Sequence, residues 1–74
     1  MNIEKFIIAM DSVKDKLYSI DFSQVSEVRF GNKANLICYQ MHKFTDIMEL
    51  RNAILNIAER CYLSNVPFTL QVIF

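Results

Sequence analysis

The first stretch of the chain, residues 3–20, has apolar residues separated by intervals of three and four. Such spacing places these side chains on one face of an α-helix. Asn2 stands where it can cap the first turn by accepting a backbone N–H. The stretch is short for a coiled coil and lacks clear flanking charge pairs, so we predict a helix that packs on a sheet. Its apolar face consists of Ile3, Phe6, Met10, Val13, Leu17 and Ile20.

Two strands, 24–30 and 34–41, are predicted on either side of the single glycine. Gly31 and its neighbour Asn32 tolerate the positive φ angles that tight hairpin turns need. We expect a three-residue loop, 31–33, because a two-residue loop would set apolar against polar residues across the strands. In that register one face of the hairpin turns towards the helices, and it consists of Val28, Phe30, Ala34, Leu36 and Cys38.

The same register predicts an outward hairpin face that is unusually apolar. An open sheet face normally carries mostly polar side chains. Tyrosine and methionine within a charged rim are typical of protein interfaces. We therefore expect a partner-binding surface made of Val25, Ile37, Tyr39 and Met41, with Glu27 and Arg29 at its rim.

The second half of the chain predicts a helix over 46–62 and a strand over 68–74. Thr45 and Asp46 suit a helix start, because their side-chain oxygens can accept a backbone N–H. Asn65 and Pro67 end the helix, and strict alternation then indicates a strand. The main apolar stripe of the helix is Ile47, Leu50, Ile54, Ile57 and Cys61. A second stripe, which packs on the first helix or forms a secondary contact with a partner, is Met48, Leu55 and Tyr62.

The predicted element order, α-β-β-α-β, describes one α+β domain over residues 1–74. We expect a two-layer sandwich in which a three-stranded, mainly antiparallel sheet carries two helices on one face. This order resembles a ferredoxin-like βαββαβ unit that lacks its first strand, a likeness of element order that carries no function. An edge left by the missing strand could pair with a partner strand, including strand 68–74 of a second copy.

Composition adds a reason to expect a partner. Hydrophobic residues make up 53% of only 74 residues, and a domain of this size buries about 60% of the surface that its unfolded chain exposes. Surplus apolar surface usually lies against another molecule. Eight Lys and Arg balance eight Asp and Glu, whereas nucleic-acid binders carry an excess of cations. A net charge of zero also favours self-association.

Candidate chemistry is sparse. Cys38 and His42 could form a catalytic pair, but a reactive thiol needs exposure and a positive environment, and Cys38 is predicted inside the core. Cys38, His42 and Cys61 lack the closely spaced ligand pairs that are typical of structural zinc. One glycine is too few for a glycine-rich phosphate loop. We therefore expect no enzyme, no cofactor and no metal site.

The expected compartment is the cytoplasm. Two widely separated cysteines, 38 and 61, do not match the disulfide framework of a small secreted domain. The first five residues include the charge pair Glu4 and Lys5, unlike a signal peptide. The apolar run 6–10 is far shorter than a membrane span, and neither predicted helix has the Lys/Arg-rich face of a membrane-surface helix. We expect no membrane association.

Two functional hypotheses follow. The first is a non-catalytic protein-binding module that acts stoichiometrically as an inhibitor, adaptor or accessory subunit, of the kind that phages and mobile elements often encode. It would bind another protein, a second copy of itself, or both. The alternative is a single-stranded nucleic-acid-binding protein that stacks bases on Tyr39 within a basic patch formed by Arg29 and Lys33 at the hairpin and by His42 and Lys43 after it. Glu27 among these cations makes the alternative the less favoured one.

Overall fold

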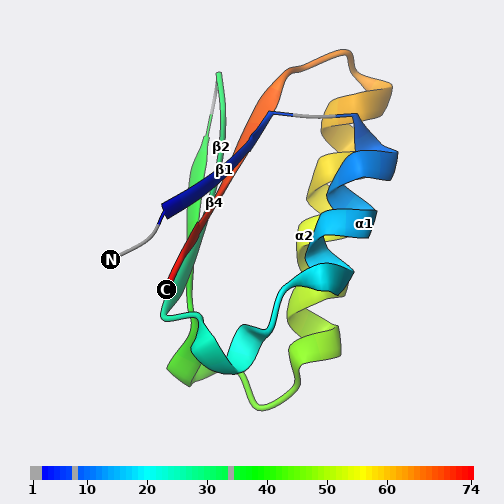
Figure 1. The fold of residues 1–74 in the computed structure, drawn as a ribbon. Helices are drawn as coiled ribbons and strands as arrows, with labels where there is room; N and C mark the ends of the chain where they lie inside the picture. Colours follow the sequence, from blue (N-terminus) through cyan, green and yellow to red (C-terminus); the bar gives the residue numbers. More distant parts are fainter. Residues whose placement is uncertain (1–2, 8, 34) are drawn as a thin grey trace.

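The computed structural model describes residues 3–7, 9–33 and 35–74 of the chain. It is a two-layer α+β structure in which two helices cover one face of an antiparallel sheet, as predicted, although the sheet has four strands rather than three (Figure 1). The elements in order are β1 (Ile3–Ile7), α1 (Met10–Ser19), a 3₁₀ turn η1 (Phe22–Gln24), β2 (Glu27–Asn32), β3 (Leu36–Gln40), a 3₁₀ turn η2 (Met41–Lys43), α2 (Ile47–Leu63) and β4 (Phe68–Ile73).

The additional strand, β1, occupies the beginning of the segment that was predicted to form the first helix. Residues 3–20 are not one helix: strand β1 pairs antiparallel with β4, and α1 begins only at Met10. The three-and-four spacing is genuine within α1, where Val13 and Leu17 are fully buried. In β1 the same spacing is a coincidence, since Ile3 is largely exposed and only Phe6 faces the core. Asn2, the predicted cap, lies outside the described residues.

The predicted hairpin register is wrong. Phe30 pairs with Ile37 and Gly31 with Leu36, and the pairing continues to Asn32, whose N–H donates to the carbonyl of Asn35 at 3.0 Å. Gly31 is therefore a strand residue, and the turn lies further along the chain than expected. An odd shift of register moves every side chain of a strand to its opposite face. Ala34, predicted to face inward, lies outside the described residues.

The strand order is β1-β4-β2-β3, and all neighbours are antiparallel. The C-terminal strand β4 is thus a central strand with β1 and β2 on either side, not the edge strand that a second copy could extend. The element succession is βαββαβ, so the strand that seemed missing from the ferredoxin-like order is present. The edges of the sheet are β1 and β3.

The core lies between the sheet and the two helices. Its largest fully buried side chains come from all layers: Phe30, Leu17, Leu50, Ile54, Leu70, Val13, Val28 and Val72. The predictions for α2 and β4 are confirmed to within one residue at each end. Asp46 caps α2 by accepting the Met48 N–H at 2.9 Å, and Asn65, with a φ of 54°, follows the helix end.

Candidate functional site

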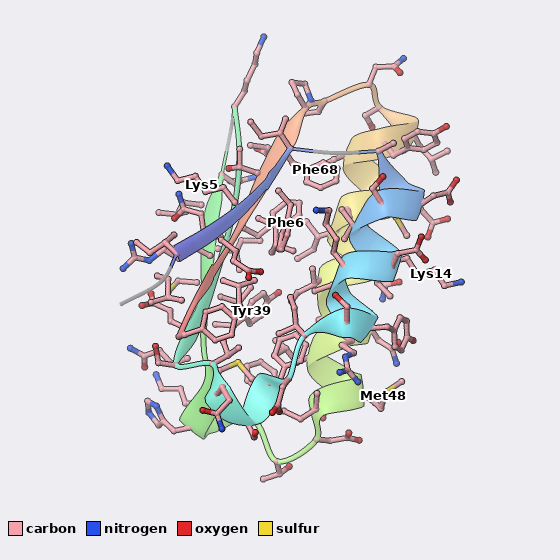
Figure 2. All side chains as sticks on the ribbon, viewed as in Figure 1. Lys5, Phe6, Lys14, Tyr39, Met48 and Phe68 are labelled. Atoms are coloured by element: carbon pink, nitrogen blue, oxygen red, sulfur yellow. The ribbon has the colours of Figure 1, made fainter. Side chains whose placement is uncertain are left out.

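The helices leave the second face of the sheet open, and all four strands contribute to it (Figure 1). Figure 2 shows Lys5 on this side and the adjacent Phe6 on the helix side. The strand registers align the outward residues in three cross-strand rows. We call this surface the open sheet face; it consists of Ile3, Ile73, Glu27 and Gln40 in the first row, Lys5, Gln71, Arg29 and Cys38 in the second, and Ile7, Thr69, Gly31 and Leu36 in the third.

Most of the predicted partner-binding residues do not lie on this face. Val25 is buried, Tyr39 and Met41 are half-buried and pack against the core, and Ile37 is half-buried. The register places Ile37 and Tyr39 opposite Phe30 and Val28 on the helix side of the sheet. The prediction of an outward patch made of these four residues is therefore wrong: Ile37 and Tyr39 depended on the incorrect hairpin register, and Val25 follows the 3₁₀ turn η1 and lies outside strand β2.

Both predicted rim residues, Glu27 and Arg29, do lie on the open sheet face. Arg29 Nε donates to Glu27 Oε1 at 3.0 Å. The Cys38 thiol donates to the same carboxylate oxygen. Cys38 was predicted to lie in the core, but it is exposed at the surface. These three side chains form one hydrogen-bonded cluster in the middle of the face.

The electrostatics of this cluster oppose thiolate chemistry. Hydrogen bonds from Arg29 and then from Cys38 lower the pKa of Glu27. The hydrogen bond with the Glu27 carboxylate raises the pKa of Cys38. A raised pKa keeps the thiol protonated near neutral pH, and the thiolate is the nucleophilic form. The cluster therefore presents a guanidinium, a carboxylate and a protonated thiol at the surface.

A shallow apolar groove lies beside the third row and shares three of its residues, Ile7, Gly31 and Thr69. Ile7 and Leu36 are 75% and 73% exposed, and between them lie the smaller residues Thr69 and Gly31. The groove has a volume of about 460 Å³ and is lined by Ile7, Gly31, Asn32, Lys33, Pro67, Phe68 and Thr69. We call it the Gly31 groove.

A side chain at Gly31 would occupy this groove without disturbing the sheet. A Cβ placed there would lie 3.5 Å from Thr69 Oγ1 and 3.8 Å from Leu36 Cδ1, which are ordinary van der Waals contacts. The absence of a side chain at position 31 is thus what keeps the floor of the groove open. Sequence reasoning missed this site because it assigned Ile7 to a helix and turned Leu36 inward.

The predicted secondary contact of Met48, Leu55 and Tyr62 is divided between surface and core. Met48 and Tyr62 are about half exposed, whereas Leu55 is half-buried and packs against the core. Between the helices, the Arg51 guanidinium carbon lies 5.2 Å from the Tyr18 ring centroid and 5.0 Å from that of Phe22. Cation–π contacts of Arg51 therefore connect α2 with α1 and with the 3₁₀ turn η1.

The residues considered for catalysis or metal binding lie in different elements of the fold. His42 is exposed in the 3₁₀ turn η2, and Cys61 is buried, where its sulfur accepts a hydrogen bond from Asn32 Nδ2 at 3.4 Å. Within the described residues, no three His, Cys, Asp or Glu side chains are grouped so that they could hold a metal ion. None of the helices in the described part of the chain is both long enough and apolar enough to cross a membrane.

The open sheet face is the better candidate for a functional surface, because its exposed apolar residues border a groove with charged side chains beside it. On the helix side, the Arg51 guanidinium already contacts the aromatic rings of Tyr18 and Phe22. Comparison of the chain with protein-family models, with curated proteins and with solved structures gave no match.

Proposed function

We propose that this chain is a non-catalytic protein-binding module that docks a protein partner on its open sheet face. It would act stoichiometrically, as an inhibitor, adaptor or accessory subunit. The observation that carries the proposal is the pair Ile7 and Leu36, both about three-quarters exposed, on either side of a floor made of Gly31 and Thr69. Burying a large aliphatic side chain is favourable by about 1.5–3 kcal/mol, so this pair could anchor an interface.

The central cluster supports a binding role over catalysis. Arg29 and Glu27 hold each other in place, and the Glu27 carboxylate keeps the exposed Cys38 thiol protonated. A polar rim with satisfied hydrogen bonds next to an apolar anchor is the usual anatomy of a protein–protein interface. A nucleophilic cysteine would need the opposite electrostatic environment.

Nucleic-acid binding keeps only part of its predicted surface, because Tyr39 borders a depression with Lys43 but not with Arg29 or Lys33. Tyr39 packs on the helix side of the sheet, where its ring meets that of Phe44 edge-on at 5.6 Å. Arg29 lies on the open sheet face, so the tyrosine and this cation do not share a surface. Single-strand binding depends on exposed aromatic platforms beside cations, and the three cross-strand rows of the open sheet face contain no aromatic residue.

Self-association through the open sheet face is opposed by charge. Lys5 and Arg29 lie in one row, and a second copy stacked on this face would bring like charges together, which is unfavourable. We therefore expect the isolated chain to be a monomer by light scattering. A dimer that persists in the double variant Ile7→Ser with Leu36→Ser would instead indicate pairing through the β1 or β3 edge.

The proposal is tested by affinity capture with matched variants. The double variant Ile7→Ser with Leu36→Ser removes the two exposed apolar side chains of the third row and is expected to lose the captured partner. The control, Tyr62→Ser with Leu63→Ser, removes two side chains that are 55% and 72% exposed at the end of α2, and it is expected to retain the partner. Thermal unfolding of both variants should stay close to that of the parent chain, because exposed substitutions have small effects.

The reverse pattern would contradict the proposal. Loss of the partner only in the Tyr62 and Leu63 variant would place the interface on the helix side. A large fall in the melting temperature of the Ile7 and Leu36 variant would show that these residues stabilise the fold instead of forming a free surface.

A further inference from the structure

We infer that the Gly31 groove accepts an acidic segment of a partner protein, in which carboxylates flank a large apolar side chain. The inference rests on the proposed function and specifies the chemistry of the partner. It is carried by the uneven distribution of charge over a chain whose formal net charge is zero.

The open sheet face and the groove beside it are positively charged. They carry Lys5, Arg29 and Lys33 but only one carboxylate, that of Glu27. The other seven acidic residues of the chain lie elsewhere in the sequence and in the fold, at positions 4, 11, 15, 21, 46, 49 and 59. The balanced overall charge therefore conceals a basic face.

Two of these cations are available to a ligand. Arg29 is engaged by Glu27, and within the described residues no ion pair joins Lys5 or Lys33 to a carboxylate. Lys33 lines the groove itself. Lys5 lies two residues before Ile7 on the same face of β1, a spacing of about 7 Å along a strand. The apolar floor thus has a lysine near each of two sides.

The dimensions of the groove suit a single peptide segment. Ile7 lines the groove and Leu36 borders its Gly31 floor; these two residues stand on the two edge strands, which three inter-strand spacings place roughly 14 Å apart. An α-helix with its side chains is about 10 Å across, and an extended strand is narrower. A larger apolar residue of the segment would rest on Gly31 and Thr69 while its acidic neighbours reach the lysines.

Other occupants fit less well. A second copy would bring its own Lys5 and Lys33 to a face that already carries them. A nucleic acid would supply negative charge, but it would find no aromatic residue in the three rows of the open sheet face and would meet the carboxylate of Glu27. An acidic, amphipathic peptide satisfies both the charge and the apolar floor.

The test is a selection from a displayed library of random peptides on the full chain. The selected peptides are expected to combine Asp or Glu with a large apolar residue. One of them is then synthesised together with a version in which every Glu and Asp is replaced by Gln or Asn, and binding is measured by fluorescence anisotropy at low and high salt. The amide version should bind more weakly, and the difference should shrink as salt rises.

Matched variants locate the contact. The double variant Lys5→Gln with Lys33→Gln should weaken binding of the acidic peptide about three- to thirtyfold, the effect of losing two exposed ion pairs. The control Lys14→Gln with Arg60→Gln changes the net charge equally at two exposed helix positions, Lys14 lying away from the sheet in Figure 2, and it should leave binding unchanged. Gly31→Val, which fills the groove, should abolish binding to both peptide versions.

The outcomes separate the inference from the proposed function. If the selected peptides show no acidic bias, or if the lysine variant binds as tightly as the control, the acidic-segment inference is wrong. It would fail alone if Gly31→Val still abolished binding, because the groove would then be a neutral docking site. If Gly31→Val leaves binding intact, or if no peptide is enriched, both the inference and the use of this groove are overturned.

Discussion

Cys38 illustrates how an incorrectly predicted cross-strand pairing changes the chemistry that is assigned to a residue. The sequence context is apolar, which suggested a buried structural cysteine, yet the side chain lies on the open sheet face beside Glu27 and Arg29. The side chain directly opposite it is Arg29, but its hydrogen bond is with a carboxylate. The pKa of Cys38 is consequently raised, and exposure does not make this thiol reactive.

Thiol alkylation should report this arrangement. Because the Glu27 carboxylate raises the pKa of Cys38, Glu27→Gln should lower that pKa towards its ordinary value and increase the thiolate fraction at pH 8. The pH profile of iodoacetamide modification at Cys38 should then move to lower pH and the rate at pH 8 should rise. Glu49→Gln, at an exposed position of α2, serves as the control. An unchanged profile in Glu27→Gln would show that the carboxylate does not contact the thiol.

At the scale of elements, the hairpin shows why register is difficult to obtain from local pattern. Pairing apolar with apolar residues across one hairpin was a reasonable criterion, but β2 also pairs with β4 on its other side. Val28 and Phe30 lie level with Val72 and Leu70 of that strand, and β2 continues through Gly31 to Asn32. The pairing of β2 with β4 extends β2 through Gly31, the residue that was predicted to begin the turn.

Engineered disulfides distinguish the two registers. Arg29→Cys places a second cysteine directly opposite Cys38, and directly paired strand residues have Cα separations of about 4.5–5.5 Å, within the range of a disulfide. Mild oxidation should therefore join positions 29 and 38. The predicted three-residue loop would instead have set Ser26 opposite Cys38, so Ser26→Cys is the matched control and should not form the bond. Non-reducing peptide mapping identifies the linked pair. A 26–38 bond would support the register of the predicted three-residue loop and contradict the register described above.

At the scale of the whole molecule, strand β1 completes the open sheet face. It adds an edge to the sheet, sends Phe6 into the core and brings Ile7 into line with Thr69, Gly31 and Leu36. The Lys16 ammonium also lies 4.6 Å from the centroid of the Phe6 ring, which links α1 to this strand. The groove that we propose as the binding site therefore needs residues of β1, β2 and β4.

The role of β1 can be tested by unfolding in urea. Phe6→Ala should lower the free energy of unfolding by about 2–4 kcal/mol, because a large buried aromatic is removed near an edge of the core. Ile3→Ala should change it by less than about 1 kcal/mol, because Ile3 is exposed on the other face. If residues 3–20 formed one helix, both side chains would lie on its buried face. Similar large losses for both variants would therefore favour the continuous helix.

The sequence by itself determined α2 and β4, the placement of the two helices on one face, and the open-face positions of Glu27 and Arg29. The helix and the strand depend on local signals: the Asp46 cap, the stop at Asn65, and an alternation that holds through Phe68–Ile73. The tertiary structure alone decided that residues 3–7 are a strand, that β3 turns Leu36 and Cys38 outward, and that β4 lies in the centre. The physical reason is that each of these choices is made by hydrogen bonding between segments far apart in the chain, which no local periodicity records.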